Sequence, residues 1–222
     1  MPAPKALRRL APDRLRDDPG LRAIALGVGL IPPRAMHSAA EGAALARLAG
    51  GARRVVELGV YEGSSALVLI RALGPGAELH LVDPFIDATG WALPAGARPS
   101  ATATRLAVRR AARGGGPNVR WHIARSQDVG RSWTGGPVDV VFIDGDHSPE
   151  GCREDWERWH EHVSSGGAVC FHDARLGHAE GNGSPGPTGV VDDLFRTADS
   201  SWAIVEEVDS LVAVRRAGTA HA

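Results

Sequence analysis

The chain has 222 residues, and its 25 Lys and Arg against 26 Asp and Glu give a formal net charge of −1 at pH 7. A chain of this size fits one domain that buries roughly 70% of the surface exposed by the unfolded form. The balanced charge gives no global field to hold a nucleic acid backbone or an anionic membrane, so a small-molecule partner is favoured.

The predicted elements begin with residues 1–35, an N-terminal helical extension that ends at Pro32 and Pro33. From 36 to 216, short β-branched runs alternate with stretches of helical spacing. The helices are predicted at 36–48, 64–73, 101–113, 149–163 and 190–197. The strands are predicted at 54–60, 78–82, 118–124, 138–143, 168–171, 202–208 and 211–214. The segment 180–189 is too rich in Gly and Pro for regular structure, and 217–222 is a flexible tail.

This alternation predicts an α/β fold with a mostly parallel, seven-stranded sheet and helices on both faces. Cys152 and Cys170 form no CxxC pattern, so both are interpreted as packing residues of a protein in a reducing compartment. Acidic residues precede the apolar stretch 21–31, and the longest apolar runs fall short of the roughly 20 residues of a membrane span. We therefore expect a cytoplasmic enzyme without membrane partners, and a homo-oligomer is left open.

In parallel sheets, ligands bind beyond the carboxyl ends of the strands, so the residues after each strand carry the functional information. The first strand runs into residues 57–65 (Glu-Leu-Gly-Val-Tyr-Glu-Gly-Ser-Ser). Gly59 and Gly63 let the backbone approach a ligand, and the following helix offers its N-terminus to a carboxylate. The GxGxxG motif is absent, which favours a ligand without a pyrophosphate.

The second and third strands also end in polar residues. Asp83 ends the second strand, where an acidic side chain accepts hydrogen bonds from ribose hydroxyls. Ser126 and Gln127 follow the third strand, where hydroxyl and amide groups can contact an adenine edge. Together these positions predict a nucleoside-containing cofactor.

Acids and histidines follow the fourth and fifth strands: Asp144, Asp146 and His147, and then His172 and Asp173. Such a cluster at a strand end is more often a site than a solvated loop. Carboxylates and imidazoles bind divalent metals, and histidine can act as a base near neutral pH. A metallohydrolase built from these five residues is the alternative function, but it leaves the first three strand ends without a role.

The strand-end motifs resemble two related families. Residues 57–65 are similar to the Glu-Leu-Gly-x-Tyr-x-Gly-x-Ser of catechol O-methyltransferases, and Ser126-Gln127-Asp128 is similar to their adenine-site motif. Residues 142–148, Gly166-Gly167 and Phe171-His172-Asp173 resemble the methyltransferase 24 family, near the macrolide sugar O-methyltransferases. The similarity spans about 36–215. It implies a Rossmann-like class I fold and transfer of a methyl group from S-adenosylmethionine to a phenol or sugar hydroxyl, in natural-product biosynthesis.

The resemblance also implies roles for single residues. The methionine part of the cofactor would be surrounded by Glu57, Gly59, Tyr61, Gly63 and Ser65, with Asp144 beside it, Asp83 on the ribose, and Ser126 and Gln127 on the adenine. Asp144, His172 and Asp173 would hold Mg²⁺ or another divalent metal. Catechol-type enzymes have an Asp-Asn pair where this chain has His172-Asp173, which leaves the metal and its identity open. His147 stands where those enzymes have a lysine base.

Three further expectations concern the surroundings of the site. The segments 86–100, with Trp91, and 180–189 should flank the substrate. The acidic residues of the helix at 149–163, Asp155 among them, are interpreted as an exposed charged face. A cofactor-binding domain of the same fold without catalysis is the third functional alternative.

Overall fold

The computed structural model describes residues 18–86, 99–177, 183–197 and 201–216. The expectations for residues 1–17, for Trp91 with most of the segment 86–100, for 180–182 and for the tail at 217–222 lie outside these ranges. No helix within the described ranges is long and apolar enough to cross a membrane.

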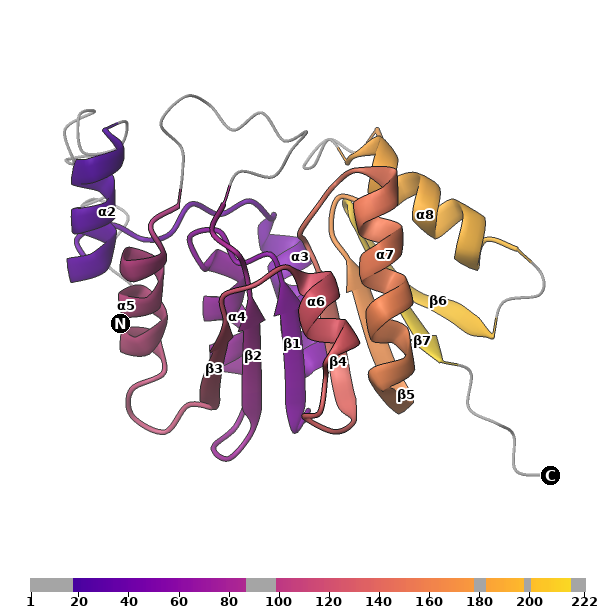
Figure 1. Cartoon of the computed structure of the whole chain (residues 1–222), viewed down its shortest axis with the longest axis horizontal. Helices are drawn as coiled ribbons and strands as arrows, with labels where there is room; N and C mark the ends of the chain where they lie inside the picture. Colours follow the sequence, from indigo (N-terminus) through magenta and orange to yellow (C-terminus); the bar gives the residue numbers. More distant parts are fainter. Residues whose placement is uncertain (1–17, 87–98, 178–182, 198–200, 217–222) are drawn as a thin grey trace.

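Seven strands form one sheet in the order β3-β2-β1-β4-β5-β7-β6 (Figure 1). Strands β1 to β5 are parallel, whereas β7 is antiparallel to both β5 and β6. The prediction of a mostly parallel, seven-stranded sheet is confirmed. The strands are β1 (Arg54–Leu58), β2 (Glu78–Val82), β3 (Asn118–His122), β4 (Val138–Ile143), β5 (Val163–Phe171), β6 (Trp202–Val208) and β7 (Leu211–Arg216).

Helices cover both faces of the sheet (Figure 1). The α-helices are α2 (Pro19–Val28), α3 (Ala39–Ala49), α4 (Ser64–Ala72), α5 (Ala101–Ala111), α6 (Ser126–Arg131), α7 (Pro149–Trp159) and α8 (Pro185–Phe195). Leu45 of α3 and Leu69 of α4 belong to the core on one face, and Trp156 and Trp159 of α7 belong to the core on the other. Both cysteines are free and buried in these cores, as expected from the sequence.

The starts of two elements, α8 and β5, differ most from the predicted boundaries. Helix α8 begins at Pro185, inside the segment predicted to be irregular. Prolines are tolerated in a first helical turn, whose N–H groups need no intrahelical partner. Strand β5 begins at Val163, where a helix was predicted, because Gly167 belongs to the strand and not to a turn. A Cβ on Gly167 would lie 3.0 Å from the Asp139 carbonyl oxygen, so glycine permits a close approach to the neighbouring strand.

Helix α6 (Ser126–Arg131) was not predicted at all, because six residues are too few to show a helical period. Helix α2 packs on α5, with Leu26 against Ala103 and Ala107. The side chain of Asp18 caps α2 by accepting the Leu21 N–H. The part of the N-terminal extension that the structure describes therefore lies against the domain.

Candidate functional site

The loops after β1 and β4 pack directly against each other. Gly59 has a φ of +85°, and a Cβ at this position would lie 2.1 Å from the Asp144 carbonyl oxygen. No other residue fits that approach. Gly63, at a φ of +88°, is the N-cap of α4 and starts that helix immediately after the loop. The glycines thus bring the loop after β1, which carries Tyr61, beside the loop after β4, which carries the candidate catalytic residue Asp144.

Glu57 is fully buried at the base of this loop. One of its carboxyl oxygens, Oε1, accepts a hydrogen bond from the Ser65 hydroxyl, and the other, Oε2, has no hydrogen-bond partner among the described residues. Burial raises the pKa of Glu57 well above its usual range, although the Ser65 hydrogen bond opposes this. A buried acceptor without a donor is costly, so this oxygen is suited to a ligand that brings a donor, above all a cationic one.

Asp83 braces the same loop from the end of β2. Its Oδ2 accepts the N–H groups of Val60 at 2.8 Å and Tyr61 at 2.9 Å, and its Oδ1 accepts the Phe85 N–H at 2.6 Å. The sequence predicted a ribose-binding carboxylate but not this bracing. A carboxylate has about four lone-pair sites, so a hydroxyl can still be accepted beside three amides.

The Ser126 side chain points inward, toward Asp155, which was predicted to be exposed. Its hydroxyl donates to Oδ1 of Asp155 at 2.5 Å. Asp155 is fully buried on α7, so its interpretation as part of an exposed charged face is wrong. Burial raises the pKa of Asp155 to about 7. Gln127 follows in the first turn of α6 and is half-buried.

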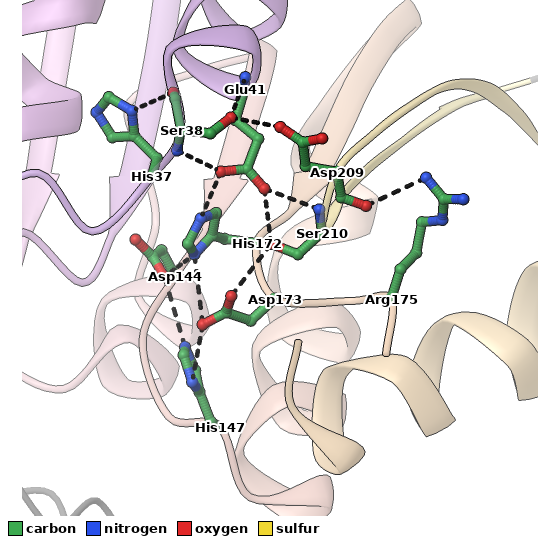
Figure 2. Close-up of polar contacts among 10 residues, drawn as sticks. All are labelled: His37, Ser38, Glu41, Asp144, His147, His172, Asp173, Arg175, Asp209 and Ser210. Atoms are coloured by element: carbon green, nitrogen blue, oxygen red, sulfur yellow. Dashed lines mark hydrogen bonds and ion pairs between the residues drawn. The ribbon is translucent and has the colours of Figure 1, made fainter. Parts of the chain in front are cut away.

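His147 lies between two carboxylates at the ends of β4 and β5 (Figure 2). Its Nε2 is 3.4 Å from Oδ1 of Asp144, and its Nδ1 is 3.7 Å from Oδ2 of Asp173. Burial alone would lower the pKa of His147, but the hydrogen bond and charge of Asp144 outweigh it and raise the pKa. The structure therefore brings together three of the residues predicted to be catalytic.

His172, the fourth predicted catalytic residue, is buried behind them, with only 2% of its side chain exposed. Its Nδ1 is 3.0 Å from Oδ1 of Asp144, and its Nε2 faces Oε2 of Glu41 at 3.5 Å. Burial would lower the pKa of His172, but the charge and hydrogen bond of Asp144, with the contribution of Glu41, raise it to about 11. The pKa of Asp144 is lowered in turn, mainly by the charge of His172 against the effect of burial.

Glu41 is the residue of this cluster that the sequence did not predict. It is buried on α3 and accepts three hydrogen bonds: from the Ser38 N–H at 2.7 Å, the Ser210 N–H at 2.9 Å and the Ser210 hydroxyl at 2.6 Å. Burial would raise the pKa of Glu41, but His172 and Ser210 bring it down to about 2. In the sequence, Ser38-x-x-Glu41 has the pattern of a capping box, and this capping box forms in the structure. The pattern alone does not reveal that Glu41 also contacts His172.

The three residues predicted to hold a metal contact one another and the neighbouring carboxylate of Glu41. A metal ligand needs a lone pair directed at the ion, and both ring nitrogens of His172 are directed at carboxylates. Within the described ranges, no group of three or more His, Cys, Asp or Glu side chains is arranged to hold an ion. Asp146, which completes the hydrolase alternative, accepts the Ser148 N–H at 2.8 Å and caps its own loop.

Comparison with known proteins identifies the family. The model of the methyltransferase 24 family, described as a methyltransferase domain, matches residues 56–174, more than half of the chain. The chain belongs to this family, and the predicted class, a methyltransferase, is confirmed.

Solved structures of methyltransferases share the fold. The O-methyltransferase TomG from Streptomyces achromogenes, in complex with S-adenosylmethionine, is 23% identical with a TM-score of 0.58, and the match covers 91% of each chain. NovP is 16% identical with a TM-score of 0.64, over 95% of this chain and 96% of its own. The Bacillus cereus O-methyltransferase, in complex with S-adenosylhomocysteine, is 19% identical with a TM-score of 0.54, over 92% and 91%. No curated protein matches the chain.

Proposed function

We propose that this methyltransferase acts on an oxygen: it transfers the methyl group of S-adenosylmethionine to a hydroxyl of a small phenol or sugar, in the synthesis of a natural product. The observation that carries the proposal is the position of His147. Its side chain is largely buried and contacts the carboxylates of Asp144 and Asp173, beside the loop after β1. A hydroxyl is a poor nucleophile until its proton is removed, and a positioned imidazole can accept that proton. TomG, which is described as acting in tomaymycin synthesis, shares the fold.

The cofactor would lie across the carboxyl ends of β1, β2 and β4. The free Oε2 of Glu57 would accept the methionine ammonium, with Ser65 holding the other oxygen of that carboxyl group. Gly59, Gly63 and Tyr61 would line the same end of the ligand. Asp83 would accept one ribose hydroxyl while it holds the loop through the Val60 and Tyr61 N–H groups. The cofactor supplies an electrophilic methyl group on its sulfonium sulfur.

The adenine would lie beyond β3, against Ser126 and Gln127. Because the Ser126 hydroxyl donates to Asp155, we propose that Ser126 offers the adenine its hydroxyl oxygen as an acceptor. Asp155 would then act as the support that fixes this hydroxyl. Gln127 would supply the amide group that completes the contact with the base edge.

His147 would take the proton of the acceptor hydroxyl, while Asp144 and Asp173 orient its ring. An in-line displacement requires the acceptor oxygen close to the methyl carbon. The two carboxylates favour the protonated ring that results from the transfer. The acceptor would therefore bind above Asp144, with its hydroxyl facing His147.

The alternatives explain less of the site. A metallohydrolase needs Asp146 and His172 as ligands, and both are engaged within the protein. A cofactor-binding domain without catalysis would have no use for a histidine between two acids. Assembly into homo-oligomers stays a prediction.

Calorimetric titration with S-adenosylhomocysteine tests the cofactor site without knowledge of the acceptor. We expect a dissociation constant in the micromolar range, and absence of binding would refute the proposal. Methyl transfer is then followed by mass spectrometry over a panel of phenols, sugar alcohols, amines and thiols. Transfer to amines alone would contradict the choice of oxygen, and cofactor binding with no transfer by wild type to any related acceptor would favour a non-catalytic domain.

A further inference from the structure

We propose that the His172 ring occupies the place of a metal ion in this site, as a cation fixed between Glu41 and Asp144, and that Glu41 is the residue that positions it. The inference deepens the proposed function, on which its catalytic meaning rests. Figure 2 shows the His172 ring between Glu41 and the pair Asp144 and Asp173, with His147 farther from Glu41.

The hydrogen-bonding partners of the ring determine its charge. An ionised carboxylate accepts hydrogen bonds and cannot donate them, whereas a neutral imidazole has one donor and one acceptor nitrogen. His172 faces a carboxylate at each nitrogen, Asp144 at 3.0 Å and Glu41 at 3.5 Å. Nδ1 is within hydrogen-bonding distance of Asp144, whereas Nε2 makes only an ion-pair contact with Glu41. A neutral ring would direct the lone pair of one nitrogen at a carboxylate, so this geometry favours the imidazolium.

The charges around the ring support the same conclusion. Glu41 and Asp144 contact it directly, and Oδ2 of Asp173 is 3.6 Å from its Nδ1. Three carboxylates in a partly buried cluster would repel one another without a cation among them. A divalent metal usually supplies the positive charge at such a site, whereas here the side chain of His172 supplies it. The raised pKa of His172 agrees with this assignment.

Glu41 is held so firmly that it can define the ring's position. The backbone N–H groups of Ser38 and Ser210 each donate to one of its oxygens, and the Ser210 hydroxyl adds a third donor. These contacts join α3 to the turn between β6 and β7. Without the Glu41 charge, Nε2 of His172 would lose its acceptor, and the ring could give up a proton and become a metal ligand.

The arrangement divides two tasks between two histidines. His172, as a permanent cation, holds Asp144 and favours negative charge developing on the acceptor oxygen nearby. It cannot also take a proton, because both of its nitrogens already carry one. That task remains with His147, whose nitrogens face Asp144 and Asp173 at longer distances.

Manganese binding tests the replacement of the metal directly, by electron paramagnetic resonance with Mn²⁺ as the probe and S-adenosylhomocysteine present. We expect wild type to bind Mn²⁺ no more tightly than millimolar. His172→Asp removes the cation and adds a third hard oxygen ligand beside Asp144 and Asp173, so it should bind Mn²⁺ at least tenfold more tightly. Micromolar binding by wild type that is lost in His172→Ala would overturn the proposal.

Nuclear magnetic resonance of protein labelled with ¹⁵N-histidine tests the charge and the role of Glu41. Both His172 nitrogens should carry protons from pH 6 to 9 in wild type. In Glu41→Gln the ring should lose a proton within this range, while Asp209→Asn, which removes a carboxylate bonded to Ser38 and not to His172, should behave as wild type. A neutral His172 in wild type at pH 7, or no change in Glu41→Gln, would refute the inference.

The same samples separate this inference from the proposed function. Each is titrated with S-adenosylhomocysteine, because the Glu41 and His172 variants should keep cofactor affinity if they fold. Wild type that fails to bind it would refute the methyltransferase proposal, while its ring protonation still decides the state of His172. If the variants do not fold, the wild-type manganese and resonance measurements alone suffice to confirm or refute the internal cation.

Discussion

His147 is the residue that we propose accepts the proton, and its surroundings determine the pH dependence that we expect. A base must be neutral before it accepts a proton, and the Asp144 and Asp173 carboxylates raise the pKa of His147 above 6.5 against the effect of burial. Turnover should therefore fall as the pH drops through that raised pKa. His147→Gln should lower kcat by about 10²–10⁴-fold and abolish this acidic limb, as measured by initial rates from pH 5.5 to 9. Unchanged turnover with the same limb would assign the base to another residue.

Asp83 has a structural and a proposed binding role, and a matched pair of ligands can separate them. Asp83→Ala should weaken S-adenosylhomocysteine binding by about 1–3 kcal/mol, through loss of a charged hydrogen bond to the ribose. If the carboxylate contacts the sugar, the variant should also lose most of the wild-type preference for S-adenosylhomocysteine over its 2′-deoxyribose analogue. Equal weakening of both ligands, measured by calorimetry, would show that Asp83 only braces the loop through Val60 and Tyr61.

Residues at strand ends could be predicted from the sequence, whereas residues that act from helices could not. Asp144, His147 and Asp173 follow apolar strands, and the geometry of a parallel sheet brings such positions together. Glu41 and Asp155 lie on helices, where a polar residue is normally exposed. Their burial depends on what packs opposite them, the turn at Ser210 and the hydroxyl of Ser126, and no local pattern encodes that partner.

At the scale of elements, the start of α8 presses on the loop that carries His147. A Cβ on Gly186 would lie 2.1 Å from the His147 carbonyl oxygen. Because this oxygen belongs to the backbone, the clash could be relieved only by moving the loop. Gly186→Ala should destabilise the protein by about 1–3 kcal/mol, as overpacking does, and should lower turnover by displacing His147.

Gly189→Ala in the same helix is the control, because no atom lies within 4 Å of a Cβ there. Alanine favours helix over glycine by up to about 1 kcal/mol, so this variant should be neutral or slightly stabilised. Urea unfolding compares the two variants. Equal stability would show that α8 moves freely relative to the loop.

Element boundaries were predicted poorly where glycine and proline have more than one meaning. In 180–189 these residues indicated a loop, yet Pro185 and Pro187 fit the first turn of α8 and Gly186 fits a tight contact. Gly167 likewise lies inside β5 because the backbone of β4 approaches it. In each case the residue was selected by a neighbouring element, which a local pattern does not reveal.

At the scale of the whole molecule, a buried ion pair joins the N-terminal extension to the loop after β1, which contains Tyr61 and Glu62. Arg22 of α2 donates twice to Glu62, at 2.7 and 2.5 Å, and the Arg34 N–H donates to the same carboxylate at 2.7 Å. Glu62 follows Tyr61 in the loop, and the side chains of Arg22 and Glu62 are only 11% and 5% exposed. Breaking such a pair leaves one buried charge without a partner.

A double-mutant cycle measures this tie. Arg22→Met and Glu62→Met should each lower the free energy of unfolding by about 3–5 kcal/mol. The double variant should lose less than the sum, because neither Arg22 nor Glu62 is left buried as an unpaired charge. Additive losses in urea unfolding would mean that the extension is not coupled to the loop through this pair.

The stability of the whole chain should fall as the pH rises above neutral, and His172 is the main reason. The folded protein holds the His172 proton up to a pKa of about 11, whereas the unfolded chain releases it near 6.5. Above pH 6.5 the unfolded state therefore binds fewer protons than the native state, so each further pH unit removes up to about 1.4 kcal/mol of stability. The raised pKa values of His147, Glu57 and Asp155 act in the same direction, because the folded protein keeps these protons above the pH at which the unfolded chain releases them. His80 and His122, whose pKa values are lowered by burial, destabilise the fold only on the acidic side. The buried thiols of Cys152 and Cys170 contribute only above about pH 9, where unfolded thiols ionise.

Urea unfolding of wild type and His172→Asn between pH 6.5 and 8.5 isolates the contribution of His172 to this pH dependence. The slope with pH should be steeper in wild type than in the variant by up to about 1.4 kcal/mol per pH unit, and equal slopes would contradict a proton held by His172 in the folded state.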